Sequence, residues 1–140
     1  MIFPPNLTVD ELNKWGKNTM TEFLDIRFTT IGEDYLEATM PVDSRTKQPL
    51  GLLHGGANVV LAETLGSVAA TLTVNKTTQY CVGLEINANH LASVKEGRVK
   101  GITKPIHLGK KTQVWEIKIY TEEGKLSCIS RITMAVIDRK

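Results

Sequence analysis

Residues 48–67 read QPLGLLHGGANVVLAETLGS, and this stretch decides the fold. Its second half belongs to an apolar run from about residue 55 to residue 74 that predicts the one long helix of the chain. Leucine, valine, alanine and glycine occupy nearly every side of that helix, and a helix that is apolar all round is a buried one. Its small residues, such as Gly56 and Gly66, would let a sheet approach closely. We therefore expect a central helix that the rest of the chain covers.

Two short helices and several strands are expected around this helix. Residues 8–11 and 19–22 both have the spacing of a capping box, in which Thr caps a helix and Glu reaches back to the cap. Period-two alternation predicts strands at residues 25–31, 35–42, 80–88, 98–104, 112–120 and 126–137, with a hairpin across 121–125. Strands joined by turns after a single long helix favour an α+β fold, in which a curved antiparallel β-sheet wraps around the helix.

Length and composition indicate one globular domain, residues 1–140. The chain is 41% apolar and 23% charged, and it contains no repeat or linker. No apolar run approaches the ~20 residues that span a bilayer. The first residues lack a basic start followed by an apolar stretch, so we expect no signal peptide, a cytoplasmic location, and reduced thiols at Cys81 and Cys128. A net charge of +2 with 6% aromatic residues does not favour nucleic acid as a partner.

Basic residues gather between residues 95 and 111, where Glu96 is the one acid. A cationic rim of this kind could hold a small polyanion such as a nucleotide-tailed cofactor. Solvated lysines on sheet edges are the alternative, and charge alone favours it. The residues concerned are Lys95, Arg98, Lys100, Lys104, Lys110 and Lys111.

Glu63 is the one carboxylate of the long apolar helix. An isolated ionised carboxylate is costly to bury, so Glu63 must be paired, protonated or open to a cleft. The helix offers no basic residue three or four positions away, whereas Ser67, one turn on, could hydrogen-bond the carboxylate. These spacings favour a functional Glu63 in a cleft over a structural ion pair.

The helix begins at His54-Gly55-Gly56, where backbone N–H groups lack partners within the helix and carry the positive end of its dipole. Glycines let a carbonyl approach that backbone closely, which is the geometry of an oxyanion hole. The alternative is that the glycines serve only a sharp entry and that His54 caps the helix. No G-x-S-x-G motif is present, and His54, His90 and His107 lack the spacing of zinc ligands, so we expect neither a serine triad nor a metal or other cofactor.

Taken together, the motifs resemble the hotdog-fold acyl-CoA thioesterases. The resemblance rests on segments 40–43, 48–49, 51–56 and 62–67, and it continues through 85–90 and 105–109 to the last strand. Within that family the chain is most similar to the bacterial group that hydrolyses 1,4-dihydroxy-2-naphthoyl-CoA in menaquinone synthesis. A related group clears misacylated aryl carrier protein in enterobactin synthesis. The resemblance implies a sheet wrapped around one helix, homotetramers built from dimers, and either acyl-CoA or an acyl carrier protein as the substrate carrier.

Carried over position by position, the resemblance implies five catalytic residues. Glu63 would be the nucleophile or the general base, and Ser67 would support it. The Gly55 amide would polarise the thioester carbonyl, His54 would help to place it, and Gln48 would hold the attacking water. The alternatives are a hotdog hydratase or dehydratase, which typically pairs an acid with a His that this helix lacks, and a non-catalytic acyl-CoA binder, which needs neither Glu63 nor Gln48.

The resemblance also implies three segments that line the CoA channel. Leu91-Ala92-Ser93 departs from the more basic sequence expected in relatives, which leaves individual side-chain contacts there open. Lys110 and Lys111 could meet the phosphates. The implied CoA-binding residues are Gly83, His90, Leu91, Ala92, Ser93, His107, Leu108, Gly109, Lys110, Lys111 and Thr112.

Helix geometry adds an expectation about assembly. Gly55 and Glu63 are eight residues apart, which is ~12 Å along a helix axis. An oxyanion donor and an attacking carboxylate must both lie within a few ångströms of one carbonyl carbon. We therefore expect a dimer in which Gln48, His54 and Gly55 of one subunit meet Glu63 and Ser67 of the other.

Overall fold

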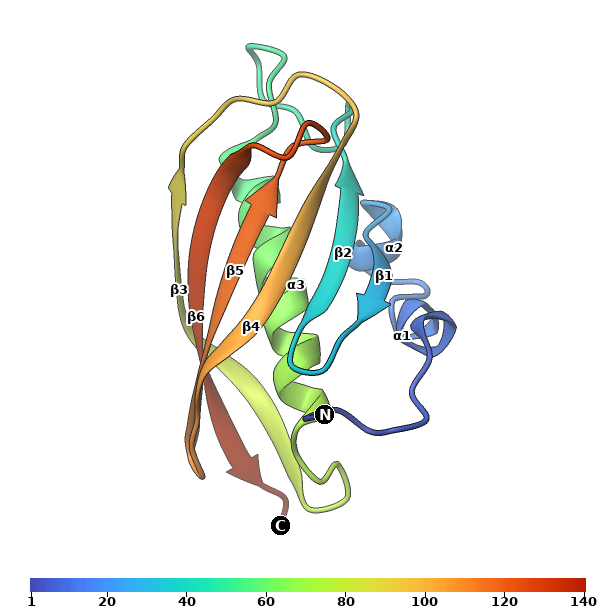
Figure 1. Cartoon of the computed structure of the whole chain (residues 1–140), viewed down its shortest axis with the longest axis vertical. Helices are drawn as coiled ribbons and strands as arrows, with labels where there is room; N and C mark the ends of the chain where they lie inside the picture. The colour runs from blue at the N-terminus through green and yellow to red at the C-terminus, as the bar shows by residue number, and fades with distance from the viewer.

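The computed structural model describes all 140 residues, and it consists of three helices and six strands. The chain begins with two short helices and a hairpin, continues with one long helix, and ends with four long strands (Figure 1). The elements are α1 (Val9–Trp15), α2 (Met20–Phe23), β1 (Arg27–Ile31), β2 (Leu36–Pro41), α3 (Gly55–Leu72), β3 (Gln79–His90), β4 (Arg98–Leu108), β5 (Thr112–Tyr120) and β6 (Leu126–Asp138).

All six strands form one antiparallel sheet in the order β1-β2-β4-β5-β6-β3. The sheet curves around α3, which packs against β2 to β6 (Figure 1). The expected α+β architecture, a curved antiparallel sheet around one central helix, is therefore confirmed. Because β1 and β3 end the strand order, β3 has a free edge along its whole length.

The core lies between α3 and the concave face of the sheet. Trp115, Ile117 and Ile119 alternate along β5 and are fully buried, as the period-two pattern requires. Each such side chain stabilises the fold by about 1.5–3 kcal/mol. Helix and sheet come into close contact through glycine: a methyl group at Gly66 would lie 2.6 Å from Ile132 Cγ2.

One of the two expected capping boxes forms. The Thr8 hydroxyl accepts from the Glu11 N–H at 3.2 Å, and the Glu11 carboxylate accepts from the Thr8 N–H at 3.3 Å. Thr19 makes no such cap, because its hydroxyl donates to the Gly16 carbonyl at 2.6 Å instead. The second capping box was therefore a wrong prediction, although α2 begins where it was expected.

Two strands extend beyond their predicted ends. β3 continues to His90 because its pairing with β6 runs from Gln79 to His90. β4 was expected to stop before Pro105, yet it continues to Leu108 through an irregularity in its register with β5 between Pro105 and His107. A bulge tolerates a residue without an N–H donor, so the proline does not end the strand.

The helix α3 is not covered on every side, which corrects the expectation of complete burial. Leu61, Ala62 and Leu65 face the sheet and are fully buried, whereas Glu63 is exposed. The reason is that β3 is an edge strand, and nothing in the chain continues the sheet past it to cover the far side of α3.

Both chain termini lie at the end of the molecule where α3 finishes (Figure 1). The Ile2 N–H donates to the Glu33 carbonyl in the β1–β2 turn at 3.0 Å, and the Arg139 N–H donates to Thr78, just after α3, at 2.7 Å. Cys81 and Cys128 are unpaired, and burial raises the pKa of both thiols. No helix is both long enough and apolar enough to cross a membrane.

Candidate active site

The start of α3 leaves one backbone N–H group free. His54 is the N-cap, and its Nδ1 accepts from the Gly56 N–H at 2.8 Å. The His54 carbonyl accepts from the N–H groups of Ala57 and Asn58 at 3.0 and 3.3 Å. The Gly55 N–H makes no hydrogen bond within the chain, so it remains available at the positive end of the helix dipole. His54 therefore caps the helix, and the bond at Nδ1 leaves the ring proton on Nε2.

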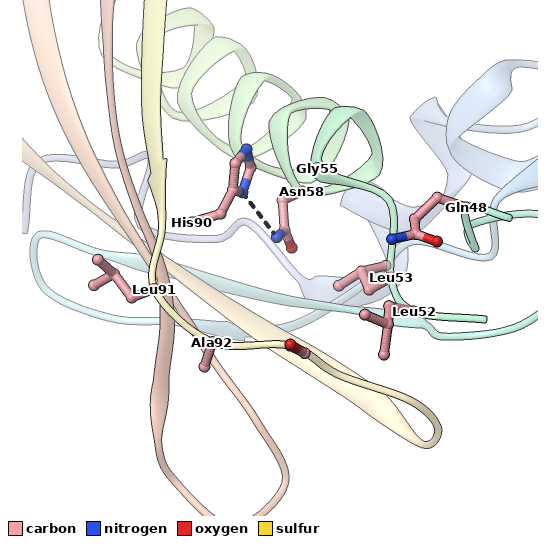
Figure 2. A pocket seen from close by; sticks show the side chains of 9 residues that line it. Gln48, Leu52, Leu53, Gly55, Asn58, His90, Leu91 and Ala92 are labelled. Carbon is pink, nitrogen blue, oxygen red and sulfur yellow. Dashed lines mark hydrogen bonds between the residues drawn. The ribbon is translucent and has the colours of Figure 1, made fainter. Parts of the chain in front are cut away.

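A pocket of about 350 Å³ opens beside this N–H group. It brings together the predicted residues Gln48 and Gly55 from one side with the end of β3 and the loop after it from the other (Figure 2). Its lining residues are Gln48, Leu52, Leu53, Gly55, Asn58, His90, Leu91, Ala92 and Ser93.

Gln48 reaches the pocket with its amide oriented. The side-chain oxygen accepts from the Leu50 N–H, which leaves the Nε2 group without an internal partner. Figure 2 shows that the nitrogen of this amide is turned toward Leu53, on the pocket side. Gln48 can therefore donate a hydrogen bond to a water or a substrate oxygen there.

His90 stands directly over the helix start. A methyl group at Gly55 would lie 2.8 Å from His90 Nε2, so a larger residue at this position would displace the His90 ring. The His90 ring is hydrogen-bonded to Asn58, whose Nδ2 lies 3.4 Å from His90 Nδ1. Asn58 is a pocket residue that the motifs do not mark; its one signal in the sequence is an amide side chain three residues after Gly55, on the apolar face of the helix.

Glu63 lies with Gly83 on the open face of α3. A methyl group at Gly83 would come within 2.8 Å of Glu63 Oε2, which places the carboxylate against the backbone of β3. In the single chain the Ser67 hydroxyl contacts Met134 Sδ at 3.9 Å rather than Glu63. The catalytic residues expected from the sequence are thus divided between two places, the helix start and the middle of its exposed face.

The predicted CoA segments are also divided. His90 to Ser93 lie at the helix start, whereas His107 to Thr112 form the β4–β5 turn at the other end of α3, about 27 Å away for an 18-residue helix. Leu108, Gly109, Lys110 and Lys111 line a second pocket there, of about 490 Å³, together with Thr73 and Val74 of the α3 end.

The basic residues between positions 95 and 111 do not form one rim. β4 runs through most of this stretch and spreads them over about 30 Å. Arg98 binds Asp25, with Nη1 2.9 Å from Oδ2, and Lys104 lies over the Tyr35 ring at 5.7 Å. Lys110 and Lys111 remain as the neighbouring pair.

The Asp25 ion pairs lie outside the pocket and fasten β4 to the start of β1. Burial raises the pKa of the Asp25 carboxyl, but hydrogen bonds and charge attraction from Arg27 and Arg98 outweigh it and hold the pKa below its usual value. No three His, Cys, Asp or Glu side chains lie close enough together to bind a metal ion.

Comparison with known proteins identifies relatives over nearly the whole chain. The family model described as the thioesterase superfamily matches residues 50–128. The 1,4-dihydroxy-2-naphthoyl-CoA hydrolase of Escherichia coli is 59% identical over 137 residues, covering 98% of this chain and 100% of that protein. The proofreading thioesterase EntH of Cronobacter sakazakii is 50% identical over 137 residues, covering 98% and 99%.

Solved structures share the architecture. A mutant thioesterase from Pseudomonas aeruginosa superposes with a TM-score of 0.97 at 49% identity, over 99% of this chain and 100% of that one. A thioesterase from Haemophilus influenzae gives a TM-score of 0.95 at 48% identity, over 99% and 96%.

Proposed function

Because the chain belongs to the thioesterase superfamily and is a thioesterase, we propose that it hydrolyses acyl-CoA thioesters with an aromatic acyl group, 1,4-dihydroxy-2-naphthoyl-CoA foremost. The relative of that name is similar over its full length. The observation that carries the proposal is the free Gly55 N–H at the start of α3, which opens into the pocket beside Gln48 and His90.

Each step of the proposed reaction has a residue to perform it. The thioester carbonyl accepts from the Gly55 N–H, where the helix dipole stabilises the negative charge of the tetrahedral intermediate. In one route Glu63 takes a proton from a water that Gln48 holds, the water adds to the carbonyl carbon, the C–S bond breaks, and the thiolate takes that proton to become the free thiol. In the other route the Glu63 carboxylate attacks the carbonyl carbon and the C–S bond breaks, which leaves a mixed anhydride on Glu63; water then hydrolyses the anhydride to the free acid, restores the carboxylate and supplies the proton that the thiolate takes. A thioester is already activated, so these groups suffice.

We propose that the reaction takes place in a dimer. Gly55 and Glu63 are ~12 Å apart along α3, too far for one thioester carbon to reach both. The free edge of β3 and the exposed face of α3 adjoin each other, and β3 presents Tyr80, Val82 and Leu84 outward. Antiparallel pairing of two β3 edges about a twofold axis would bring the second subunit's Glu63 to the first subunit's Gly55.

The same pairing supports the proposed CoA channel. In an antiparallel pair the end of one α3 lies beside the start of the other. The β4–β5 turn of the second subunit, with Lys110 and Lys111, would then approach the pocket of the first. Its two ammonium groups are the charge that the nucleotide phosphates of CoA require.

A panel of substrates tests the proposal. We expect free thiol release from 1,4-dihydroxy-2-naphthoyl-CoA, benzoyl-CoA and phenylacetyl-CoA, with slower release from medium-chain acyl-CoA. An aryl thioester on an acyl carrier protein distinguishes the second candidate, proofreading of a misacylated carrier, which the similarity to EntH favours. Absence of thiol release from every CoA thioester would refute the proposal.

A further inference from the structure

Asn58 is the buried polar side chain of the pocket to which the proposed reaction gives no role. It is 4% exposed, and it lies on the sheet side of α3. Its Nδ2 lies 3.4 Å from His90 Nδ1, whereas its Oδ1 is the one buried side-chain nitrogen or oxygen in the chain without a hydrogen-bond partner. Leaving a buried acceptor unpaired costs about 1–3 kcal/mol, so the position favours a molecule that supplies a donor.

The amide is directed into the pocket. Figure 2 shows the Asn58 side chain pointing from the helix into the space bounded by His90, Leu53 and Ala92. Because His90 lies beside the nitrogen, the oxygen is the atom of this amide that is left without a partner. Any occupant that satisfies it must carry an N–H or O–H group at that point.

The spacing along the helix indicates which group that is. Asn58 follows Gly55 by three residues, which is ~4.5 Å along the axis. Every CoA thioester, whatever its acyl group, carries the amide N–H of the cysteamine unit two methylene groups beyond the sulfur, whereas ring hydroxyls such as those of the 1,4-dihydroxy-2-naphthoyl group change with the acyl group. In an extended chain the amide nitrogen lies about 5 Å from the carbonyl carbon. A carbonyl bound at the Gly55 N–H therefore brings this amide to the level of Asn58.

We propose that Asn58 Oδ1 accepts a hydrogen bond from the cysteamine amide N–H of the pantetheine arm, an inference that rests on the proposed hydrolysis at Gly55. Asn58 is then a specificity residue for pantetheine thioesters, and His90 positions it by accepting from its Nδ2. The same contact serves CoA and acyl carrier proteins alike, because both present the acyl group on a pantetheine arm.

Two small substrates isolate the contact. One is the benzoyl thioester of N-acetylcysteamine; the other is the benzoyl thioester of 5-mercaptopentan-2-one, in which a methylene replaces the amide N–H. We expect the wild-type chain to hydrolyse the amide substrate with kcat/KM about 10-fold higher. Asn58→Leu should lose about this factor on the amide substrate and change little on the ketone. Asn58→Ala gives the same comparison if the leucine variant does not fold, because the ratio of the two substrates is what matters.

A stability control separates recognition from folding. Thr103 is another fully buried polar residue; it lies in β4, away from the pocket, and its hydroxyl donates to the carbonyl of Glu116 in β5 at 3.0 Å. Thr103→Val removes this hydroxyl. It should leave the substrate ratio unchanged, and Asn58→Leu should unfold at the same temperature as the wild type or higher.

The outcomes are distinct. Equal loss on both substrates, or a wild-type chain indifferent to the methylene replacement, would overturn the role of Asn58 while leaving the proposed function intact. A wild-type chain that releases no thiol from the two small substrates or from any CoA thioester of the panel would overturn the proposed function and this inference with it.

Discussion

The Glu63 side chain can be changed without altering the packing of the hydrophobic core. Glu63 is exposed in the chain and touches Gly83, whereas the residues next to it in the sequence, Ala62 on one side and Thr64 on the other, are buried or half-buried. Its carboxylate contributes nothing to the packing of α3. Changes at this position therefore report on chemistry rather than on folding.

Glu63→Ala should reduce kcat at least ~100-fold, because it removes the proposed nucleophile or general base. The melting temperature should stay within about 2 °C of the wild-type value, since an exposed side chain is lost. Thiol-release kinetics and thermal unfolding measure the two quantities. A variant that keeps wild-type turnover would show that the carboxylate takes no part in the reaction.

Gly83 and Gly101 allow the same substitution, glycine to alanine, to be compared beside the catalytic carboxylate and in the core. A methyl group at Gly83 meets the mobile end of Glu63 at 2.8 Å, while a methyl group at Gly101 meets Leu65 Cδ1 in the core at 2.5 Å. We expect Gly83→Ala to lower kcat about 10- to 100-fold by displacing the carboxylate, with stability retained. Gly101→Ala should instead lower the free energy of unfolding by about 1–3 kcal/mol through overpacking. Urea unfolding and kinetics of both variants check the contrast, and a destabilised but fully active Gly83→Ala would contradict it.

At the scale of elements, the junction before β1 is fixed by charge. Asp25 adopts a positive φ of 55° and binds Arg27 and Arg98, which joins the end of the helical region to β4. Asparagine also tolerates this backbone conformation, so Asp25→Asn removes the charge without adding strain.

Asp25→Asn should destabilise the chain at pH 7 by about 1–2 kcal/mol, the loss of charged hydrogen bonds at a partly exposed site. The pKa of Asp25 is lowered in the folded state, so its stabilisation exists above the unfolded pKa and disappears as pH falls through the folded one. The difference between variant and wild type should therefore shrink from about pH 5 downward. Urea unfolding across this range measures it. Asp34→Asn, at an exposed carboxyl without an ion pair, is the control, and a pH-independent difference would exclude the charge effect.

The elements also show what the sequence could predict. Apolar periodicity located α3 within two residues of its end and all six strands, because burial of these segments is decided locally. The sequence favoured a cleft at Glu63, but it could not show that this whole side of α3 is exposed, since that depends on which strand ends the sheet, and strand order is a long-range property. Gln48 and Gly55, proposed for catalysis, line one pocket with residues 90–93, proposed for CoA, whereas His54 does not line it. Asn58 escaped notice because its role depends on His90, 32 residues away in the sequence and adjacent only in the fold.

At the scale of the whole molecule, one chain holds the parts of a site without joining them. The donor Gly55 and the carboxylate Glu63 belong to one rigid helix, so no side-chain motion can close the ~12 Å between them. A second copy of the chain can pair with the free β3 edge and so bring its own Glu63 to this Gly55.

Mixing inactive variants tests this arrangement. Gln48→Ala and Glu63→Ala co-assembled in equal amounts should give about half mixed dimers, each with one intact site and one doubly damaged site. Activity should return to about a quarter of wild type. Recovery no higher than that of the parent variants, with mixed dimers confirmed by native mass spectrometry, would assign both residues to one subunit.

The position of the chain ends has a practical consequence for such experiments. Both termini lie where α3 finishes, far from the Gly55 pocket of their own chain (Figure 1). In an antiparallel dimer that same end is adjacent to the neighbour's pocket. A purification tag or fluorescent fusion would then crowd the entrance of the opposite subunit, and labels of different colour on the two variants would report by energy transfer how the subunits are oriented.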